Sequence, residues 1–276
     1  MKFSIITINY NNCKGLKRTL DSIISQTCRE FEWIVIDGGS RDGSRELIEQ
    51  HHDTMTYWCS EPDKGIYNAM NKGVKKANGD YCLFLNSGDN LCNSKVIEHL
   101  ISMPFSADIV SGDIYIDGYS HKYLRKSVNN INALWLYDNS LCHPATWIRR
   151  ELLLKNPYHE NYKTISDWVF FFETLVIKSC SYQHIPYAFS VFYKDGISNS
   201  PNFNARAYAD KYAYLKTVFP AKYVDDKAKD ESYYFISSNV LRMTKLGKFL
   251  MKVLFRLVMF VELRFLKPLS HFTVVS

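Results

Sequence analysis

The stretch over residues 31–44, FEWIVIDGGSRDGS, constrains the fold of this chain more than any other segment. Aromatic and β-branched residues dominate positions 32–36, which predicts a buried strand, and the small residues at 38–40 end it abruptly. Asp37 therefore follows a strand directly, and ligands of open α/β sheets bind at the carboxyl ends of strands. Taken alone, the segment is equally compatible with an ordinary strand-to-helix turn.

Two further segments favour the ligand-binding interpretation. Residues 60–76, SEPDKGIYNAMNKGVKK, begin with a turn and continue with apolar residues at helical spacing. Residues 80–89, DYCLFLNSGD, predict a hydrophobic strand that ends in a small polar cluster. Asp89 is thus a second carboxylate at the end of a strand.

The order of elements predicts an α/β fold with a mostly parallel, Rossmann-like sheet flanked by helices. Strands are expected near residues 3–8, 32–36, 55–59, 80–85 and 107–111, and helices near 14–26, 43–50, 66–77 and 94–101. Further strands are expected after Ser111, followed by a polar lid loop at 196–201 and helices at 203–219 and about 229–266. We expect one domain over residues 1–202 and a C-terminal helical extension over residues 203–276.

Five ordered segments resemble the family 2 glycosyltransferases, which are inverting, nucleotide-sugar-dependent enzymes with the GT-A fold. The segments are IVIDGGSRDGS, SEPDKGIYNAMNKG, FLNSGD, CHPATWIRREL and SDWVFFF. Together with the opening strand FSIITINYNN they extend over residues 1–200. Each segment alone is unspecific, but coincidence does not explain five of them in order. The resemblance implies that residues 1–202 form a GT-A catalytic domain.

The resemblance implies a nucleotide-binding role for four residues. Asp37 matches the acidic residue that binds the nucleobase. Thr7 and Asn9, at the end of the first strand, would form a wall of the same pocket. Asp63 falls in the loop that closes on the nucleotide.

The same resemblance implies a metal, a base and an acceptor side. Residues 86–89 occupy the position of the family's Asp-x-Asp motif, where Asp89 would hold Mn²⁺ or Mg²⁺ against the donor diphosphate. Asp167 matches the catalytic base, and His143 borders the acceptor. Asn86 and Gly88 stand where carboxylates are frequent, which predicts a modest affinity for the metal.

The reaction explains these residue types. Cleavage of the bond between the anomeric carbon and a nucleoside diphosphate builds negative charge on the leaving phosphate, which a cation stabilises. The attacking hydroxyl loses a proton, for which a carboxylate within hydrogen-bond reach is a suitable base. One base and a direct attack predict inversion of the anomeric configuration.

Each site residue also has a structural interpretation. Asp167 could cap the helix that begins near Trp168, and His143 could be a structural histidine. Asp89 and Asp63 could be turn residues. The aromatic side chains at residues 168 and 170–172 are expected in the core and not at a sugar.

Composition indicates a globular protein of a reducing compartment. The chain has 276 residues, of which 46% are hydrophobic, enough for one substantial core. Its seven cysteines are scattered and form no C-x-x-C pair, which argues against a zinc site or a disulfide framework. The apolar stretch at residues 3–8 is too short for a signal peptide, so we expect a cytoplasmic protein.

The C-terminal segment carries the excess charge. Seven basic residues after position 241 face Glu262 alone, so this segment accounts for the whole formal net charge of +6. Its basic side chains at 245, 248, 252 and 256 share one face of a predicted helix, with apolar residues opposite. Residues 242–267 therefore predict a helix on an anionic membrane surface, at the inner face, or one docked on the catalytic domain. No nucleic-acid module accompanies the charge, so no nucleic-acid partner is expected.

Three classes of function follow from these patterns. The first is a glycosyltransferase that moves a sugar, with UDP as the expected carrier, to a saccharide or polyprenyl-linked acceptor in surface polysaccharide biosynthesis. A catalytically idle protein that binds nucleotide-sugars is the second, because the metal motif is thinned. A nucleotidyltransferase is the third, although NYNNCKGL offers Gly15 alone where a glycine-rich phosphate loop is expected, and no Walker P-loop occurs.

Overall fold

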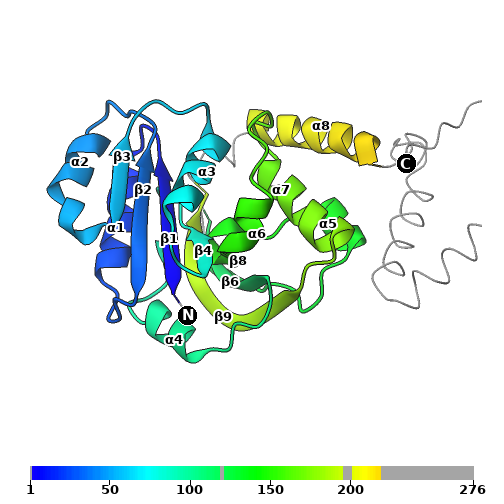
Figure 1. Ribbon diagram of the computed structural model, residues 1–276, viewed down its shortest axis with the longest axis horizontal. Helices are drawn as coiled ribbons and strands as arrows, with labels where there is room; N and C mark the ends of the chain where they lie inside the picture. Colours follow the sequence, from blue (N-terminus) through cyan, green and yellow to red (C-terminus); the bar gives the residue numbers. More distant parts are fainter. Residues whose placement is uncertain (1, 119–120, 195–200, 219–276) are drawn as a thin grey trace, which may run out of the picture.

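The computed structural model describes residues 2–118, 121–194 and 201–218 (Figure 1). The strands are β1 (Phe3–Asn9), β2 (Phe31–Asp37), β3 (Tyr57–Ser60), β4 (Tyr81–Phe84), β5 (Asn90–Leu91), β6 (Ile109–Asp117), β7 (Lys122–Arg125), β8 (Thr146–Arg149) and β9 (Tyr182–Tyr193). The helices are α1 (Cys13–Ile24), α2 (Ser44–Gln50), α3 (Ile66–Lys76), α4 (Val96–Ser102), α5 (Ala133–Asp138), α6 (Arg150–Lys155), α7 (Ser166–Phe171) and α8 (Pro201–Val218). Short helical turns occur at η1 (His52–Thr54), η2 (His143–Ala145) and η3 (Phe172–Ile177).

The described strands form one sheet in the order β3-β2-β1-β4-β8-β6-β9-β5, with β7 paired to β6. The neighbours β3, β2, β1 and β4 are all parallel. Beyond β4 the directions mix, because β8 runs antiparallel to both β4 and β6, whereas β9 is parallel to β6. The prediction of an α/β fold with a mostly parallel, helix-flanked sheet is confirmed.

Alternation along the central strands sends side chains into two cores, as expected for a sheet covered on both faces. Ile6 and Ile34 lie in a cluster with side chains of α3, α6 and α7. Ile5 and Val35 lie in a second cluster with side chains of α1, α2 and α4. Figure 1 shows α1 and α2 on one side of the sheet and α3, α6 and α7 on the other.

The aromatic residues that follow Asp167 belong to the core. Trp168 and residues 170–172 are at most 4% exposed, which confirms their predicted burial. Tyr214 and Leu215 of α8 are buried in the same cluster. The described part of the C-terminal extension therefore packs against the helices that carry Asp167.

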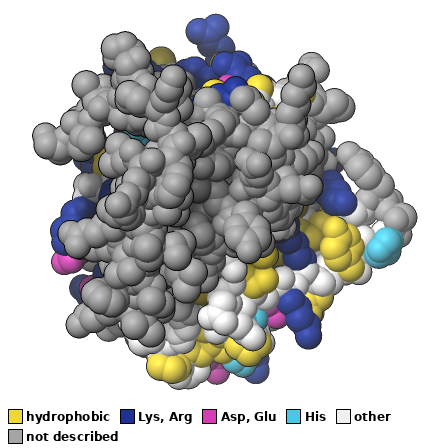
Figure 2. Space-filling view, turned by 90° about the vertical axis from the view of Figure 1, so that its right-hand side faces the viewer, with side chains coloured by type: hydrophobic (Ala, Val, Ile, Leu, Met, Phe, Trp, Pro, Cys, Tyr) yellow, Lys and Arg dark blue, Asp and Glu magenta, His cyan; other side chains and the backbone are white. Residues whose placement is uncertain are grey.

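The strand expected at residues 107–111 is longer than its apolar run, because β6 continues to Asp117 and pairs with β9 along its length. The helices expected at about 229–266, the basic segment at 242–267 and nearly all of the 196–201 loop lie outside the described residues. Within the described ranges, no helix has the length and apolarity needed to cross a bilayer. Figure 2 shows one end of the molecule, where described basic and hydrophobic side chains adjoin and acidic ones are sparse.

Candidate active site

Asp37 ends β2 and is completely buried. The strand register places Asn9 of β1 and Ser60 of β3 directly beside it. Its carboxylate accepts hydrogen bonds from Asn9 Nδ2 (2.7 Å), from Ser60 Oγ (2.6 Å) and from the backbone N and Oγ of Ser40 (2.9 and 2.5 Å). Burial by itself would raise the pKa of Asp37, but these hydrogen bonds outweigh it and hold the pKa below its usual value. The ionised side chain thus fixes the ends of three adjacent strands.

Thr7 lies deeper in the sheet than Asn9. Its hydroxyl donates to the carbonyl of Leu85 (2.8 Å) and accepts from Trp33 Nε1 (3.0 Å), and the residue is fully buried. The structure therefore brings Asn9 and Asp37 together at the strand ends. The side chain of Thr7 instead bonds to Leu85 and Trp33 inside the protein.

Asp63 lies in the loop between β3 and α3, against the residue that follows Asp37. A Cβ added at Gly38 would be 3.1 Å from Asp63 Oδ2 and 3.1 Å from the Tyr10 ring. Lys72 of α3 donates to Asp63 Oδ1 (2.6 Å) and to Glu61 Oε1 (2.7 Å). Burial lowers the pKa of Lys72, but its bonds to Asp63 and Glu61 outweigh it and raise the pKa overall. Lys72 thereby ties this loop to the helix behind it.

Residues 86–89 form a tight turn after β4. The amide of Asp89 donates to the carbonyl of Asn86 (2.9 Å), and Gly88 has a φ of 111°, a left-handed value that favours glycine. Thr19 of α1 holds the turn, because its hydroxyl donates to the carbonyl of Asp89 (2.6 Å) and accepts from the amide of Gly88 (3.0 Å). Asn12, just after β1, donates to the carbonyl of Ser87 (3.0 Å). The turn is therefore attached to the loop that follows Asn9.

The oxygens of this turn suit a hard divalent cation. Asp89 is 8% exposed, and Asn86 Oδ1 is buried without a hydrogen-bond partner among the described residues. Carboxylate and amide oxygens are ligands that Mg²⁺ and Mn²⁺ accept. The described ranges hold no group of three or more His, Cys, Asp or Glu residues that could bind a metal.

Asp167 lies in the first turn of α7 and is half-buried. Its Oδ1 accepts a hydrogen bond from the hydroxyl of Tyr67 on α3 (2.8 Å). Its Oδ2 has no hydrogen-bond partner, and the carboxylate no ion pair, within the described part of the chain. Burial raises the pKa of Tyr67, and the charge of Asp167 raises it further, so the phenol stays a donor. Ile165 is the N-cap of α7, so capping does not account for Asp167.

His143 is buried beside Asp167 and belongs to an aromatic cluster. Its Nε2 lies 3.0 Å from the Tyr158 hydroxyl, and its ring packs against Phe84 and Phe171. Burial lowers the pKa of His143, and the nearby Asp167 opposes this only in part. The imidazole is therefore neutral near pH 7.

The charges of Asp89 and Asp167 both affect the thiol of Cys142. Burial raises the pKa of the Cys142 thiol, and the charge of Asp89 and that of Asp167 both raise it further, whereas Arg125 lowers it. Cys142 directly precedes His143, whose ring lies 5.7 Å from that of Phe171 on α7, the helix that carries Asp167. The Asn12–Ser87 contact joins the turn of Asp89 to the loop that follows β1.

Sequence reasoning missed Ser40, Ser60, Tyr67 and Lys72. Ser60 ends its strand as Asp37 does, and Lys72 stands at a polar position between the apolar residues of its helix, so both carry a local signal. Tyr67 reads as a core aromatic in the helix, and its bond to Asp167 spans 100 residues. Such a contact exists only once the fold has formed.

Solved structures share this architecture. S. aureus TarS 1-349 in complex with UDP-GlcNAc matches with a TM-score of 0.59 at 20% identity, over 74% of this chain and 61% of the TarS chain. The mannosyltransferase PcManGT from Pyrobaculum calidifontis, in complex with GDP-Man and Mn²⁺, has a TM-score of 0.59 at 14% identity, over 89% of this chain and 72% of that chain. At such identities the likeness shows the fold, which is GT-A.

Relatives of known sequence extend the likeness beyond the fold. A PGL/p-HBAD biosynthesis glycosyltransferase of Mycobacterium bovis (strain BCG / Pasteur 1173P2) is 32% identical over 185 residues, 61% of this chain and 67% of that protein. An uncharacterized glycosyltransferase of Mycobacterium tuberculosis is 41% identical over 99 residues, 36% of this chain and 38% of that protein. The family model described as glycosyl transferase family 2 matches residues 4–163, more than half of the chain. The chain therefore belongs to glycosyl transferase family 2 and is a glycosyltransferase.

Proposed function

We propose that this enzyme transfers a sugar from a UDP-linked donor, with inversion, to a hydroxyl of a saccharide or lipid-linked acceptor during surface polysaccharide synthesis. The observation that carries the proposal is the half-buried carboxylate of Asp167, whose Oδ1 accepts from the Tyr67 hydroxyl (2.8 Å) while Oδ2 has no hydrogen-bond partner among the described residues. The UDP-GlcNAc complex of TarS supports UDP as the carrier, and the PGL/p-HBAD biosynthesis relative supports a glycoconjugate product.

In this proposal the nucleoside binds at the ends of β1, β2 and β3. Asp37 acts by holding Asn9, Ser40 and Ser60 in place, because all of its hydrogen bonds lie inside the protein. Asp63, tied to Lys72 and lying against Gly38, forms the side of the pocket that the donor would contact.

A divalent cation, Mn²⁺ or Mg²⁺, would be held by Asp89 and Asn86. When bound, it would supply positive charge to the diphosphate that leaves the sugar. Asn86 Oδ1, buried and without a described partner, is the feature that supports this assignment, together with the Mn²⁺ of the PcManGT complex. A single carboxylate in the turn is consistent with an affinity that depends on the bound nucleotide.

Asp167 acts as the general base. Its Oδ1 is held by Tyr67, so Oδ2 is the oxygen that receives the proton of the acceptor hydroxyl as that hydroxyl attacks the anomeric carbon. The attack displaces the diphosphate from the opposite face, which inverts the configuration in one step. His143 stays neutral and packs below the acceptor side.

A thermal-shift screen of nucleoside diphosphates tests the proposal. A ligand at about 100 times its Kd stabilises the native state by about 2.7 kcal/mol, which raises the Tm by roughly 5 °C for a chain of this size. UDP is expected to give this shift, GDP a smaller one, and Mn²⁺ to enlarge the UDP shift. In Asp89→Ala the increment due to Mn²⁺ is expected to vanish. A protein that no nucleoside diphosphate stabilises would contradict the proposed function.

Residues 242–267, which lie outside the described residues, are proposed to hold the enzyme on the inner, anionic face of a membrane. Each basic residue contributes about 1 kcal/mol at such a surface. The full chain with Lys245, Lys248, Lys252 and Arg256 all changed to Gln is therefore expected to bind vesicles of phosphatidylglycerol at least 100-fold more weakly in a co-sedimentation assay. Wild-type protein on neutral phosphatidylcholine vesicles is the control. Undiminished binding of the variant would favour a helix docked on the catalytic domain.

A further inference from the structure

A shallow pocket opens on the far side of the catalytic region from the nucleotide residues. It holds about 260 Å³ of empty space open to solvent, and residues of β6, β7, α5 and the segment before η2 line it. In the sheet, β6 lies beyond β4 and β8, whereas Asn9, Asp37 and Ser60 lie at the ends of β1, β2 and β3. The pocket therefore belongs to the side from which an acceptor would approach.

Two adjacent cations give this pocket its charge. The side chains of Arg125 and Lys126 are exposed and form no hydrogen bond or ion pair with any residue in the described ranges. Asp113, on the strand that pairs with the Arg125 strand, is buried and bonded to the Ser127 amide and to His184. Ser127, Ser140, the ring of Trp135 and Cys142 lie in the same wall.

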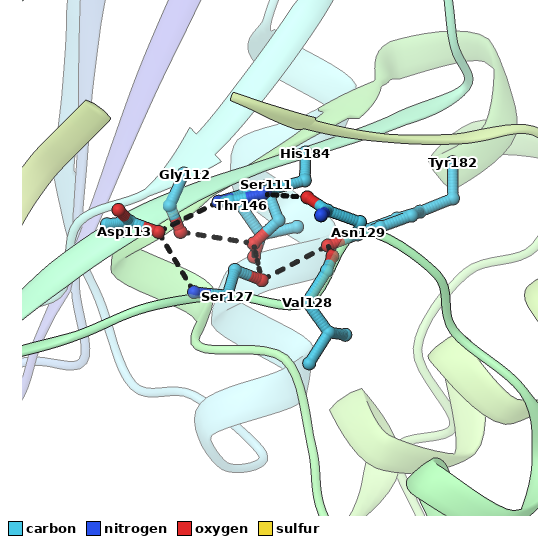
Figure 3. Close-up of polar contacts among 9 residues, drawn as sticks. All are labelled: Ser111, Gly112, Asp113, Ser127, Val128, Asn129, Thr146, Tyr182 and His184. Carbon is cyan, nitrogen blue, oxygen red and sulfur yellow. Dashed lines mark hydrogen bonds and ion pairs between the residues drawn. The ribbon is translucent and has the colours of Figure 1, made fainter. Parts of the chain in front are cut away.

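A partly buried network holds the segment that follows these cations. Figure 3 shows Asp113 Oδ1 accepting from the Ser127 amide (2.9 Å) and lying 2.8 Å from His184 Nε2. His184 Nδ1 lies 2.7 Å from Asn129 Oδ1, and the Tyr182 hydroxyl donates to the carbonyl of Val128 (2.8 Å). The chain from 127 to 129 is thereby fixed to β6 and β9, so the pocket exists without a ligand.

The pocket adjoins the reacting groups. Cys142 lines it and directly precedes His143, whose ring lies 5.7 Å from that of Phe171 on α7, the helix that carries Asp167. An acceptor whose hydroxyl lies at Asp167 would therefore place a neighbouring group of the same molecule beside Arg125 and Lys126.

We propose that this pocket binds a phosphate group that the acceptor carries close to its reactive hydroxyl, an inference that rests on the proposed function. A phosphate monoester bears a charge of about −1.5 to −2 at pH 7, which Arg125 and Lys126 together match. The guanidinium of Arg125 offers paired donors to phosphate oxygens, and the ammonium of Lys126 offers further ones. A carboxylate, with a single charge, binds this set more weakly. The Trp135 ring provides an apolar surface for the attached sugar.

The indole N–H signal of Trp135 reports on the pocket directly. In ¹⁵N-labelled full-length protein, five tryptophans give five indole signals, and Trp135→Phe identifies the one required. The protein is first saturated with UDP and Mn²⁺, so that phosphate probes cannot occupy the donor site. Glucose 1-phosphate is then expected to shift the Trp135 signal in a saturable manner, glucuronate to do so with weaker affinity, and glucose to have no effect.

A charge-matched pair of variants tests the assignment. Arg125→Gln/Lys126→Gln is expected to weaken glucose 1-phosphate binding at least tenfold while the Kd for UDP stays within twofold. Arg45→Gln/Lys155→Gln removes the same charge from exposed ion pairs on α2 and α6, and is expected to change neither value. Equal affinity for glucose 1-phosphate in wild type and the first variant would overturn the inference, as would a response to glucose equal to that to glucose 1-phosphate.

Two other results overturn different claims. The glucose 1-phosphate response of Trp135 could be present without UDP and absent at saturating UDP, or Arg125→Gln/Lys126→Gln could lose affinity for UDP. Either result would show that the pocket serves the donor diphosphate. The inference would then fail while the proposed function stands. If wild-type protein binds no nucleoside diphosphate, the proposed function fails and the inference falls with it.

Discussion

Replacing Asp167 with Asn is expected to lower the rate of sugar transfer by about 10²- to 10⁴-fold, the range that a positioned general base contributes. Asn keeps the size of the side chain and the oxygen that accepts from Tyr67, but it takes no proton from the acceptor hydroxyl. Initial rates at saturating donor and acceptor measure the effect on kcat. Calorimetric titration with UDP is expected to show a Kd within twofold of the wild-type value.

Two companion variants separate the role of the base from general damage. Asp53→Asn removes an exposed carboxylate in η1, and its transfer rate is expected to equal that of wild type. Tyr67→Phe leaves the base but frees its Oδ1, so a smaller loss in kcat is expected, with an unchanged Kd for UDP. Transfer at the wild-type rate by Asp167→Asn would refute the assignment of Asp167.

Replacing Asp37 with Ala is expected to weaken UDP binding at least tenfold and to destabilise the fold by about 3 kcal/mol. The change leaves donors of Asn9, Ser40 and Ser60 without their acceptor at the ends of three strands, and each unpaired buried donor costs about 1–3 kcal/mol before relaxation. Urea unfolding measures the stability, and the midpoint is expected to fall without a change in the slope.

The stability difference is expected to depend on pH. The folded-state pKa of Asp37 lies below that of the unfolded chain, so the carboxylate contributes fully above the unfolded value of about 4. Its contribution is lost as the pH falls from there through the folded value. The difference between the unfolding midpoints of wild type and Asp37→Ala should therefore be constant around neutral pH and shrink as the pH falls below about 4.

Asp42→Ala is the matched control for Asp37→Ala. Asp42 lies five residues further on, is exposed, and accepts from the amides of Cys13 (2.7 Å) and Ser44 (3.2 Å) near helix starts. Its loss is expected to cost about 1 kcal/mol, as for a helix cap, and to leave UDP affinity unchanged. Equal effects of the two substitutions would show that Asp37 has no special part in the nucleotide site.

The first half of the fold was predictable because its signals are local. Glu32–Ile36 reads as a strand from its own composition, and the spacing of Ile66 and Met70 identifies α3. The second half depends on pairing between distant segments. β6 pairs with β9 some 70 residues later in the chain, and nothing within residues 112–117 announces that partner.

The candidate site divides in the same way. Asp37 could be recognised because it follows a strand, but its burial could not, since Ser40 and Ser60 reach it only after β2 and β3 align. Arg125 and Lys126 read as ordinary surface charges. Their position beside Cys142 results from a hairpin fixed by Asp113 and His184, which are themselves far apart in the sequence.

Helix α3 has a consequence for how the enzyme can work. Lys72 holds the donor-side loop through Asp63, and Tyr67, within two turns of the same rigid helix, orients the base. If the donor nucleotide shifts that loop on binding, we expect the shift to reach the Tyr67 hydroxyl and so the orientation of Asp167. The contact to the donor-side loop and the contact to the general base thus both come from α3. This arrangement favours an ordered reaction in which the donor binds before the acceptor.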